Sequence, residues 1–180
     1  SKDTDKHGRI IADKSQSSDK LREAQDKMYE RYGTTRNNTF DINQIREAKH
    51  PVLWKMGNDW GLEDIYVKIH NQRPGQIFTY HLDKSSSGYR GAQTYADVDP
   101  EKIVRLFIFL DDWRPGQHIC LGQTQLYWKR GDVLWFDWQN AAHGTANCSH
   151  YDRPMLLITG IKTQKFLEKF YKFTKVEIQA

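Results

Sequence analysis

The stretch DIYVKIHNQRPGQIFTYHLD, residues 64–83, predicts two short strands joined by a tight turn. The segments on either side of the turn are rich in β-branched and aromatic residues, which favour extended structure. The tetrapeptide Arg-Pro-Gly-Gln between them carries proline and glycine in the order that a type II turn needs. The same tetrapeptide recurs at 114–117 with nothing similar around it, so we interpret it as reused turn chemistry.

Segments of the same character continue to residue 161. We expect eight strands, near residues 64–70, 76–83, 103–110, 118–121, 124–128, 132–137, 143–147 and 154–161. The segment 106–110 is apolar on both faces, as expected for a strand that lies between a core and covering helices. Eight short strands with few helices predict a mainly β fold, a sandwich or barrel of the jelly-roll kind.

Helices are expected at both ends of this β region. Apolar residues at helical spacing over 21–32 predict a first helix, with Ser18 or Asp19 as its N-cap. A shorter helix is expected over 41–49, ending before Pro51. A last helix is expected over 163–173, with phenylalanines along one stripe. Residues 1–17 are poor in apolar side chains, so we expect a disordered leader there and a single domain over 18–180.

Composition excludes several classes of protein. Two cysteines, Cys120 and Cys148, are too few for a disulfide framework or a thiolate zinc site, and we expect both to be buried. No apolar run is long enough for a membrane span, and the first residues show no signal-peptide pattern, so we expect a cytoplasmic protein without a membrane partner. The net charge of +4 comes from surpluses near the two ends, which makes nucleic acid an unlikely partner.

Histidine and carboxylate residues are the remaining candidates for chemistry. The chain has no phosphate loop, nucleophile elbow, HExxH or CxxC motif, but two histidines begin a His-x-Asp motif. These pairs are His81 with Asp83 and His150 with Asp152. Residues i and i+2 of a strand point to the same face, so either pair could hold one metal ion.

The order of histidines along the chain separates the two pairs. A second histidine ligand must come from another strand, and no histidine follows His150. The earlier pair can recruit His118, His143 or His150. Only His143 is followed ten residues later by a basic residue, Arg153, which would suit the carboxylate of a co-substrate. Two imidazoles and one carboxylate leave three adjacent positions open on an octahedral ion.

These motifs together resemble the Fe(II)/2-oxoglutarate-dependent oxygenases. The run from Gln72 to Asp83 is similar to the histidine-x-aspartate region of the prolyl hydroxylases. The segment 105–110, the segment 128–137 and His143 resemble the aspartyl/asparaginyl β-hydroxylase-like branch. The resemblance covers about residues 64–161. It implies a double-stranded β-helix, a jelly-roll and cupin-like fold, with covering helices near both ends.

The resemblance also implies the chemistry and the residues that carry it. His81, Asp83 and His143 would bind Fe(II), and Arg153 would hold the far carboxylate of 2-oxoglutarate. Arg105 resembles the arginine that contacts the near carboxylate, although an ion pair with Asp111 or Asp112 is equally open. The enzyme would be a dioxygenase that hydroxylates a peptidyl proline, aspartate or asparagine, or a free amino acid. It would use O2 and release succinate and CO2.

Two residues depart from the patterns of these oxygenase families, and two other functions stay open. Met155 stands where many relatives have a hydroxyl residue, and Gln72 stands where prolyl hydroxylases often have a tyrosine that contacts 2-oxoglutarate. The alternatives are a cupin-like metal enzyme that does not use 2-oxoglutarate and a non-catalytic jelly-roll binding module. Aromatic residues on or near the strands belong to a substrate pocket or to the core; the candidates are Tyr80, Tyr95, Trp135 and Trp138.

Overall fold

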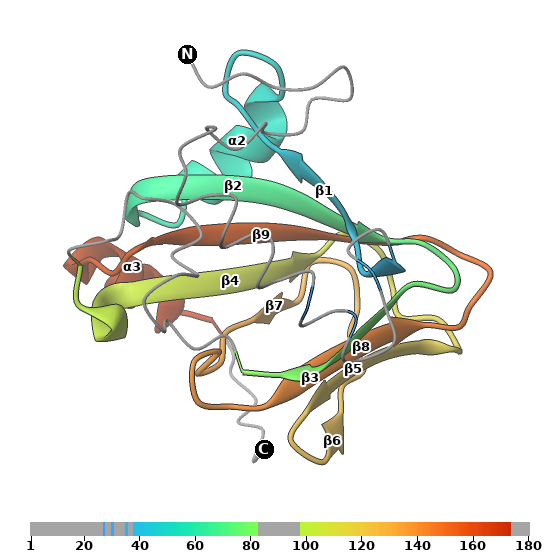
Figure 1. Ribbon diagram of the computed structural model, residues 1–180. Coiled ribbons are helices and arrows are strands. Elements are labelled where there is room, and N and C mark those ends of the chain that lie inside the picture. Colours follow the sequence, from blue (N-terminus) through green and yellow to red (C-terminus); the bar gives the residue numbers. More distant parts are fainter. Residues whose placement is uncertain (1–26, 28–29, 31–34, 36–37, 83–97, 174–180) are drawn as a thin grey trace.

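The computed structural model describes residues 38–82 and 98–173, together with Lys27, Glu30 and Thr35. These residues form two antiparallel sheets that lie one above the other (Figure 1). The first sheet has the strand order β1-β2-β9-β4-β7 and the second β3-β8-β5-β6. The strands are β1 (Asp41–Gln44), β2 (Glu63–Gln72), β3 (Ile77–His81), β4 (Ile103–Phe109), β5 (Gln117–Leu121), β6 (Thr124–Gln125), β7 (Val133–Leu134), β8 (His143–Asn147) and β9 (Arg153–Ile161).

The strand order identifies a double-stranded β-helix. Counted from β2, the first sheet contains the first, eighth, third and sixth strands, and the second sheet contains the second, seventh, fourth and fifth. The chain therefore winds back and forth between the sheets, and β1 extends the first sheet at its edge. All eight predicted strands are present, which confirms the expected fold. The strands β6 and β7 are shorter than predicted because each lies at a sheet edge and pairs on one side only.

The repeated tetrapeptide forms the same turn twice. Gln76 N–H donates to Arg73 O at 3.1 Å, and Gln117 N–H donates to Arg114 O at 3.0 Å. In both turns the glycine before the glutamine has a positive φ, 83° and 90°, which glycine tolerates without a steric penalty. The glutamine side chain then accepts a hydrogen bond from the backbone N–H of the arginine. The prediction of reused turn chemistry is confirmed.

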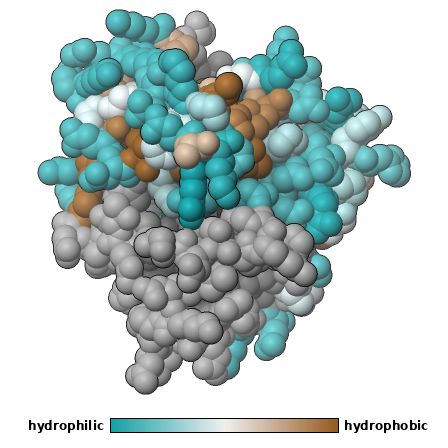
Figure 2. Space-filling view, turned by 90° about the horizontal axis from the view of Figure 1, so that it is seen from above, coloured by the Kyte–Doolittle hydropathy of each residue, from teal (hydrophilic) through white to brown (hydrophobic). Residues whose placement is uncertain are grey.

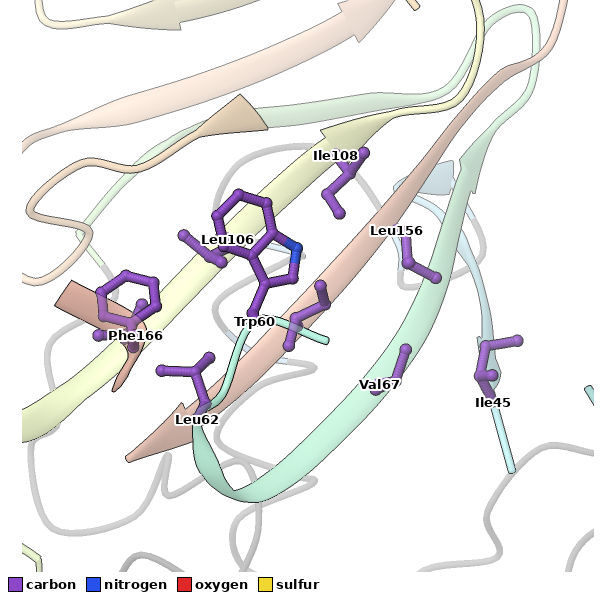
Figure 3. Close-up of a cluster of buried hydrophobic side chains, with 10 residues drawn as sticks. Ile45, Trp60, Leu62, Val67, Leu106, Ile108, Leu156 and Phe166 are labelled. Carbon is purple, nitrogen blue, oxygen red and sulfur yellow. The ribbon is translucent and has the colours of Figure 1, made fainter. Parts of the chain in front are cut away.

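Two apolar clusters lie on opposite faces of the first sheet. Alternate residues of β4 separate them, with Leu106 and Ile108 on one side and Phe107 and Phe109 on the other. The outer cluster packs between the sheet and the helices and includes Ile45, Trp60, Leu62, Val67, Leu106, Ile108, Leu156 and Phe166 (Figure 3). The inner cluster lies between the two sheets and includes Phe109, Ile119, Leu121, Leu126, Trp128 and Met155. The strand 106–110 is therefore buried on both faces, as predicted.

The helices cover the outer face, with one correction to the prediction. Helix α2 (Pro51–Asn58) begins where the sequence predicted a helix to end, and the first residues of the predicted helix over 41–49 form β1. Proline suits the first turn of a helix, where its missing N–H has no partner to lose. Helix α3 (Gln164–Phe170) confirms the predicted last helix, with Thr163 as N-cap and Phe166 buried. A short 3-10 helix, η3 (Pro100–Lys102), precedes β4.

The side of the molecule that carries α2 mixes apolar and hydrophilic surface. Figure 2 shows apolar residues near the centre of this face, with hydrophilic residues around them. No helix of the described residues is long and apolar enough to cross a membrane. In the predicted first helix, the two described residues, Lys27 and Glu30, are helical. The predicted leader, residues 1–17, lies outside the described residues.

Candidate active site

Two of the predicted metal ligands, His81 and His143, lie side by side. His81 ends β3 and His143 begins β8, and the two residues are direct partners in the antiparallel register. Direct partners point to the same face of a sheet. Their ring centroids are 4.2 Å apart with an interplanar angle of 55°. The structure thus brings together two residues that are 62 positions apart in the chain.

Both histidines are held in the tautomer that suits a metal ligand. Nδ1 of His81 lies 2.8 Å from Thr79 O, and Nδ1 of His143 lies 2.9 Å from Ala141 O. A carbonyl oxygen can only accept a hydrogen bond, so each Nδ1 carries the proton and the lone pair lies on Nε2. A backbone carbonyl on the second ring nitrogen is a common partner of metal-binding histidine. The chemistry of this donor pair therefore fits a divalent metal.

The third predicted ligand, Asp83, lies outside the described residues. It follows His81 by two positions, so the sequence-based expectation that it joins the pair stays a prediction. Within the described part of the chain, no group of three histidine, cysteine, aspartate or glutamate side chains is arranged to hold a metal ion. Of the three predicted metal ligands, the structure therefore describes His81 and His143.

A continuous belt of aromatic rings holds the histidine pair. His81 packs on Phe78 and His143 packs on Phe136, so the pair of imidazoles lies between two phenyl rings. The ring belt crosses the space between the sheets, with centroid distances of 5.2 Å for His70–Phe40, 5.7 Å for Phe40–Phe78, 3.9 Å for Phe78–His81, 5.0 Å for His143–Phe136 and 5.8 Å for Phe136–Phe107. Packed rings restrict rotation of the imidazoles, and the apolar surroundings strengthen electrostatic interactions at the pair.

The predicted co-substrate residue, Arg153, is buried between the sheets. It begins β9 and is 2% exposed. Its Nη2 donates to Gln72 Oε1 and its Nη1 to Met155 Sδ, at 3.4 Å in the second case. Both partners are neutral, and Nε has no hydrogen-bond partner among the described residues. Loss of hydration on burial lowers the pKa of Arg153 to about 9.

Gln72 connects Arg153 to β8, the strand that begins at His143. Gln72 is the direct partner of Arg153 in the β2–β9 register, and its Nε2 donates to Thr145 Oγ1 at 3.0 Å. Thr145 follows His143 by two residues on β8, which corresponds to about 6.7 Å along a strand. Gln72 and Thr145 therefore link the guanidinium to the strand that carries His143. Sequence reasoning missed Thr145, although its spacing of two from His143 places both on one face.

Arg105 lies on the inner face of β4, in neither of the predicted ion pairs. Asp111 pairs with Arg114 at 3.3 Å, and Asp112 accepts a hydrogen bond from the backbone N–H of Arg130. The guanidinium carbon of Arg105 instead lies 3.8 Å from the centroid of the Trp138 ring. The role of Arg105 toward 2-oxoglutarate stays a prediction.

The other histidine motif and several aromatic candidates lie elsewhere. His150 is exposed in the turn before β9, and Asp152 accepts a hydrogen bond from Asn71, so this motif does not form a site. Tyr80 is 49% exposed and donates to Gly122 O. Trp135 packs on Phe166 in the outer cluster and belongs to the core.

The structure tests the prediction that both cysteines are buried. The prediction that Cys148 is buried was wrong, because it lies exposed in the turn between β8 and β9. Cys120 is half-buried on β5. Tyr95 lies outside the described residues.

Comparison with known proteins finds similarity among solved structures alone. No family model and no curated protein matches the chain. Among solved structures, a protein with a double-stranded beta-helix domain from Klebsiella pneumoniae is 12% identical, with a TM-score of 0.42 over 74% of this chain and 86% of that chain. A cupin 2 conserved barrel domain protein from Salinispora arenicola is 10% identical, with a TM-score of 0.40 over 75% and 85%. An RmlC-like cupin protein from Desulfovibrio desulfuricans is 13% identical, with a TM-score of 0.40 over 69% and 84%.

Proposed function

We propose that the protein is an Fe(II)- and 2-oxoglutarate-dependent dioxygenase that hydroxylates a peptidyl or free amino acid. The observation that carries this proposal is the buried guanidinium of Arg153, whose two hydrogen-bond partners are neutral. A buried charge is costly unless an opposite charge accompanies it. Arg153 is linked to the strand that carries His143 through Gln72 and Thr145. A metal-binding pair beside a buried cation suits a co-substrate that has both a metal-binding end and a distant carboxylate.

The metal would be held by Nε2 of His81 and His143, with Asp83 as the third ligand. When bound, Fe(II) supplies the reaction of O2 with 2-oxoglutarate, which yields succinate and CO2 and inserts one oxygen atom into a C–H bond. The chain itself supplies the position of the ligands. The backbone carbonyls of Thr79 and Ala141 orient the two imidazoles, and the ring belt keeps them from turning.

Arg153 would hold the far carboxylate of 2-oxoglutarate. Its Nη1 contacts only the weak acceptor Met155 Sδ and its Nε contacts no described residue, so both edges of the guanidinium keep N–H donors for a carboxylate oxygen. Gln72 fixes the orientation of the guanidinium from the other side. Trp128, whose ring centroid is 5.8 Å from the guanidinium carbon, adds an apolar wall that excludes water. In this arrangement Gln72 binds the arginine and not the co-substrate. The tyrosine that prolyl hydroxylases often have at this position contacts the co-substrate itself.

The test is titration of 2-oxoglutarate into the iron-loaded protein, followed by measurement of succinate. We expect saturable binding, with succinate released only when Fe(II) and O2 are present. His143→Ala should abolish metal binding and turnover. His118→Ala is the matched control, because His118 is an exposed histidine of the neighbouring strand β5 and should change neither.

The outcomes separate the proposal from the two alternatives. Metal binding through His81 and His143 without 2-oxoglutarate binding would support a cupin-like metal enzyme with another substrate at Arg153. If His143→Ala keeps wild-type metal affinity, the histidine pair is structural. Absence of both metal and 2-oxoglutarate binding would leave a non-catalytic binding module.

A further inference from the structure

The side chain of Gln72 is the one oxygen-bearing group that contacts the guanidinium of Arg153 among the described residues. Both side chains are buried, and the two residues are direct partners in the register of β2 and β9. Nη2 of Arg153 donates to Oε1 of Gln72, and Nη1 donates to the thioether of Met155. A buried arginine is therefore held by neutral groups, although a carboxylate would be its strongest partner.

No charged side chain of the described residues compensates this guanidinium. Loss of hydration alone lowers the pKa of Arg153, without a contribution from a neighbouring charge. Arg73, which follows Gln72, pairs with Asp41 at the surface. Asp152, which precedes Arg153, is exposed. Strand β8 carries no lysine, arginine, aspartate or glutamate. The charge of Arg153 is thus available to an anion that enters from outside.

Hydrogen bonds at both ends fix the direction of the Gln72 amide. A guanidinium can only donate, so the amide oxygen faces Arg153. The amide nitrogen donates to Thr145 Oγ1 at 3.0 Å and to the backbone oxygen of Thr39 at 3.3 Å. A reversed amide would set nitrogen against the guanidinium and oxygen against a carbonyl that can only accept. Thr145 therefore helps to orient Gln72, and Gln72 orients Arg153.

An amide and a carboxylate would have opposite effects at this position. Glutamate has nearly the same shape as glutamine, and it would place a carboxylate oxygen where Oε1 of Gln72 now contacts Arg153. The internal ion pair would compensate the guanidinium, and it would compete with any carboxylate that enters from outside. The neutral amide orients the guanidinium and leaves its charge uncompensated.

We propose that Gln72 is a positioning residue that holds Arg153 while leaving its charge for the co-substrate carboxylate, and that Thr145 positions Gln72. The inference rests on the proposed function and deepens it, because it names the residues that set the affinity of this position for a carboxylate. Thr145 follows His143 by two residues of β8. One strand therefore carries a predicted metal ligand and also orients the group that binds the distant carboxylate.

The first test compares two substitutions of Gln72 by titration of 2-oxoglutarate into the iron-loaded protein without oxygen. Gln72→Glu should lose at least about thirtyfold in affinity, as the loss of an available charged partner implies. Gln72→Met should lose no more than about tenfold, because it removes one hydrogen bond and leaves the guanidinium charged. A purely structural role predicts the opposite order, since glutamate keeps both the shape and the hydrogen bond to Arg153.

Two further glutamines supply matched controls. Gln123→Glu adds the same charge at an exposed position and should leave 2-oxoglutarate affinity unchanged. Gln117 is buried, and its side chain bonds the backbone of Arg114 and the hydroxyl of Ser149. Gln117→Glu therefore buries a carboxylate without a guanidinium partner. In urea unfolding it should lose more stability than Gln72→Glu, whose carboxylate faces Arg153.

Substitutions of Thr145 test the second positioning step. Thr145→Val keeps the shape and removes the acceptor of Gln72 Nε2, so 2-oxoglutarate affinity should fall about two- to tenfold. Thr145→Ser keeps the hydroxyl and should restore most of the affinity. Metal affinity should stay unchanged in both variants, which verifies that β8 still presents His143. An equal loss in the valine and serine variants would contradict a role for the hydroxyl.

A pH profile of stability tests the charge of Arg153 without any ligand. Burial lowers its pKa from 12.5 to about 9, so above pH 9 the folded wild type releases a proton that the unfolded chain keeps. The free energy of unfolding of the wild type should therefore rise relative to that of Gln72→Glu, in which the carboxylate holds the proton on Arg153. Urea unfolding between pH 7 and about pH 11 measures this difference.

The outcomes distinguish the inference from the proposed function. If Gln72→Glu binds 2-oxoglutarate as tightly as the wild type, or if the two pH profiles run parallel, Gln72 does not keep the charge of Arg153 available and the inference is overturned. If the wild type does not bind 2-oxoglutarate, the proposed function fails. Diverging pH profiles would then still show that Gln72 leaves Arg153 uncompensated, because that measurement uses no ligand.

Discussion

Replacing Arg153 by methionine is expected to separate stability from co-substrate binding. The side chain is 2% exposed and its hydrogen bonds go to a neutral amide and a thioether. Burial of an ion costs several kcal/mol, whereas the amide oxygen of Gln72 that loses its donor costs about 1–3 kcal/mol. Methionine has a similar unbranched stem and no charge. We therefore expect the free energy of unfolding of Arg153→Met to equal or exceed that of the wild type.

The same substitution should impair the binding of 2-oxoglutarate. Truncation of one partner of a buried charge pair costs about 2–5 kcal/mol, which corresponds to a loss of about 30- to several thousand-fold in affinity. Arg153→Lys keeps the charge without the fork and should lie between methionine and wild type. Urea unfolding measures the stability, and titration calorimetry on the iron-loaded protein without oxygen measures the affinity.

A control and two outcomes decide the interpretation. Arg114→Met removes a partly exposed arginine that pairs with Asp111 and stacks on Tyr151, and should change stability by no more than about 1 kcal/mol. If Arg153→Met is less stable than the wild type by about 3 kcal/mol or more, the arginine is a structural element of the sheet. If its affinity for 2-oxoglutarate is unchanged, the reasoning from the buried guanidinium is refuted.

Three other changes test the fold and the titration of the site. Gly116→Ala should destabilise more than Gly75→Ala: both glycines have positive φ, but only at Gly116 would a Cβ lie 2.9 Å from the backbone of Cys148, so equal losses in urea unfolding contradict the clash. Phe166→Ala should cost about 3–5 kcal/mol of unfolding free energy and Phe173→Ala, which is 53% exposed, much less; similar losses would mean that α3 is not anchored through its buried ring. Because burial lowers the pKa of Arg153 to about 9, 2-oxoglutarate affinity should fall as the pH rises above that value and the guanidinium loses its proton, and a constant affinity up to pH 11 would contradict a lowered pKa at the binding position.

Much of the fold follows from local sequence chemistry. The two Arg-Pro-Gly-Gln turns and the strands rich in β-branched and aromatic residues depend on neighbours in the chain, and both predictions were confirmed. The phenylalanines at helical spacing in α3 also depend on neighbours in the chain, and the predicted last helix was confirmed. The predicted helix over 41–49 was wrong because Asp41–Gln44 pairs with β2, and a contact between separate segments outweighed helix propensity. Pro51, which was expected to follow the end of a helix, instead lies in the first turn of α2.

The candidate site was determined only in part by the sequence. The motif around His81, and the spacing of ten between His143 and Arg153, pointed to two histidines that the structure brings into ring contact. The contact of Gln72 with Arg153 spans 81 positions, and the hydrogen bond from Gln72 to Thr145 joins β2 to β8. These neighbours depend on the register between strands far apart in the chain, because a shift of one residue would turn each side chain to the other face. That register is decided by packing of the two sheets and the covering helices, so only the tertiary structure reveals which polar groups share the interior with the histidines.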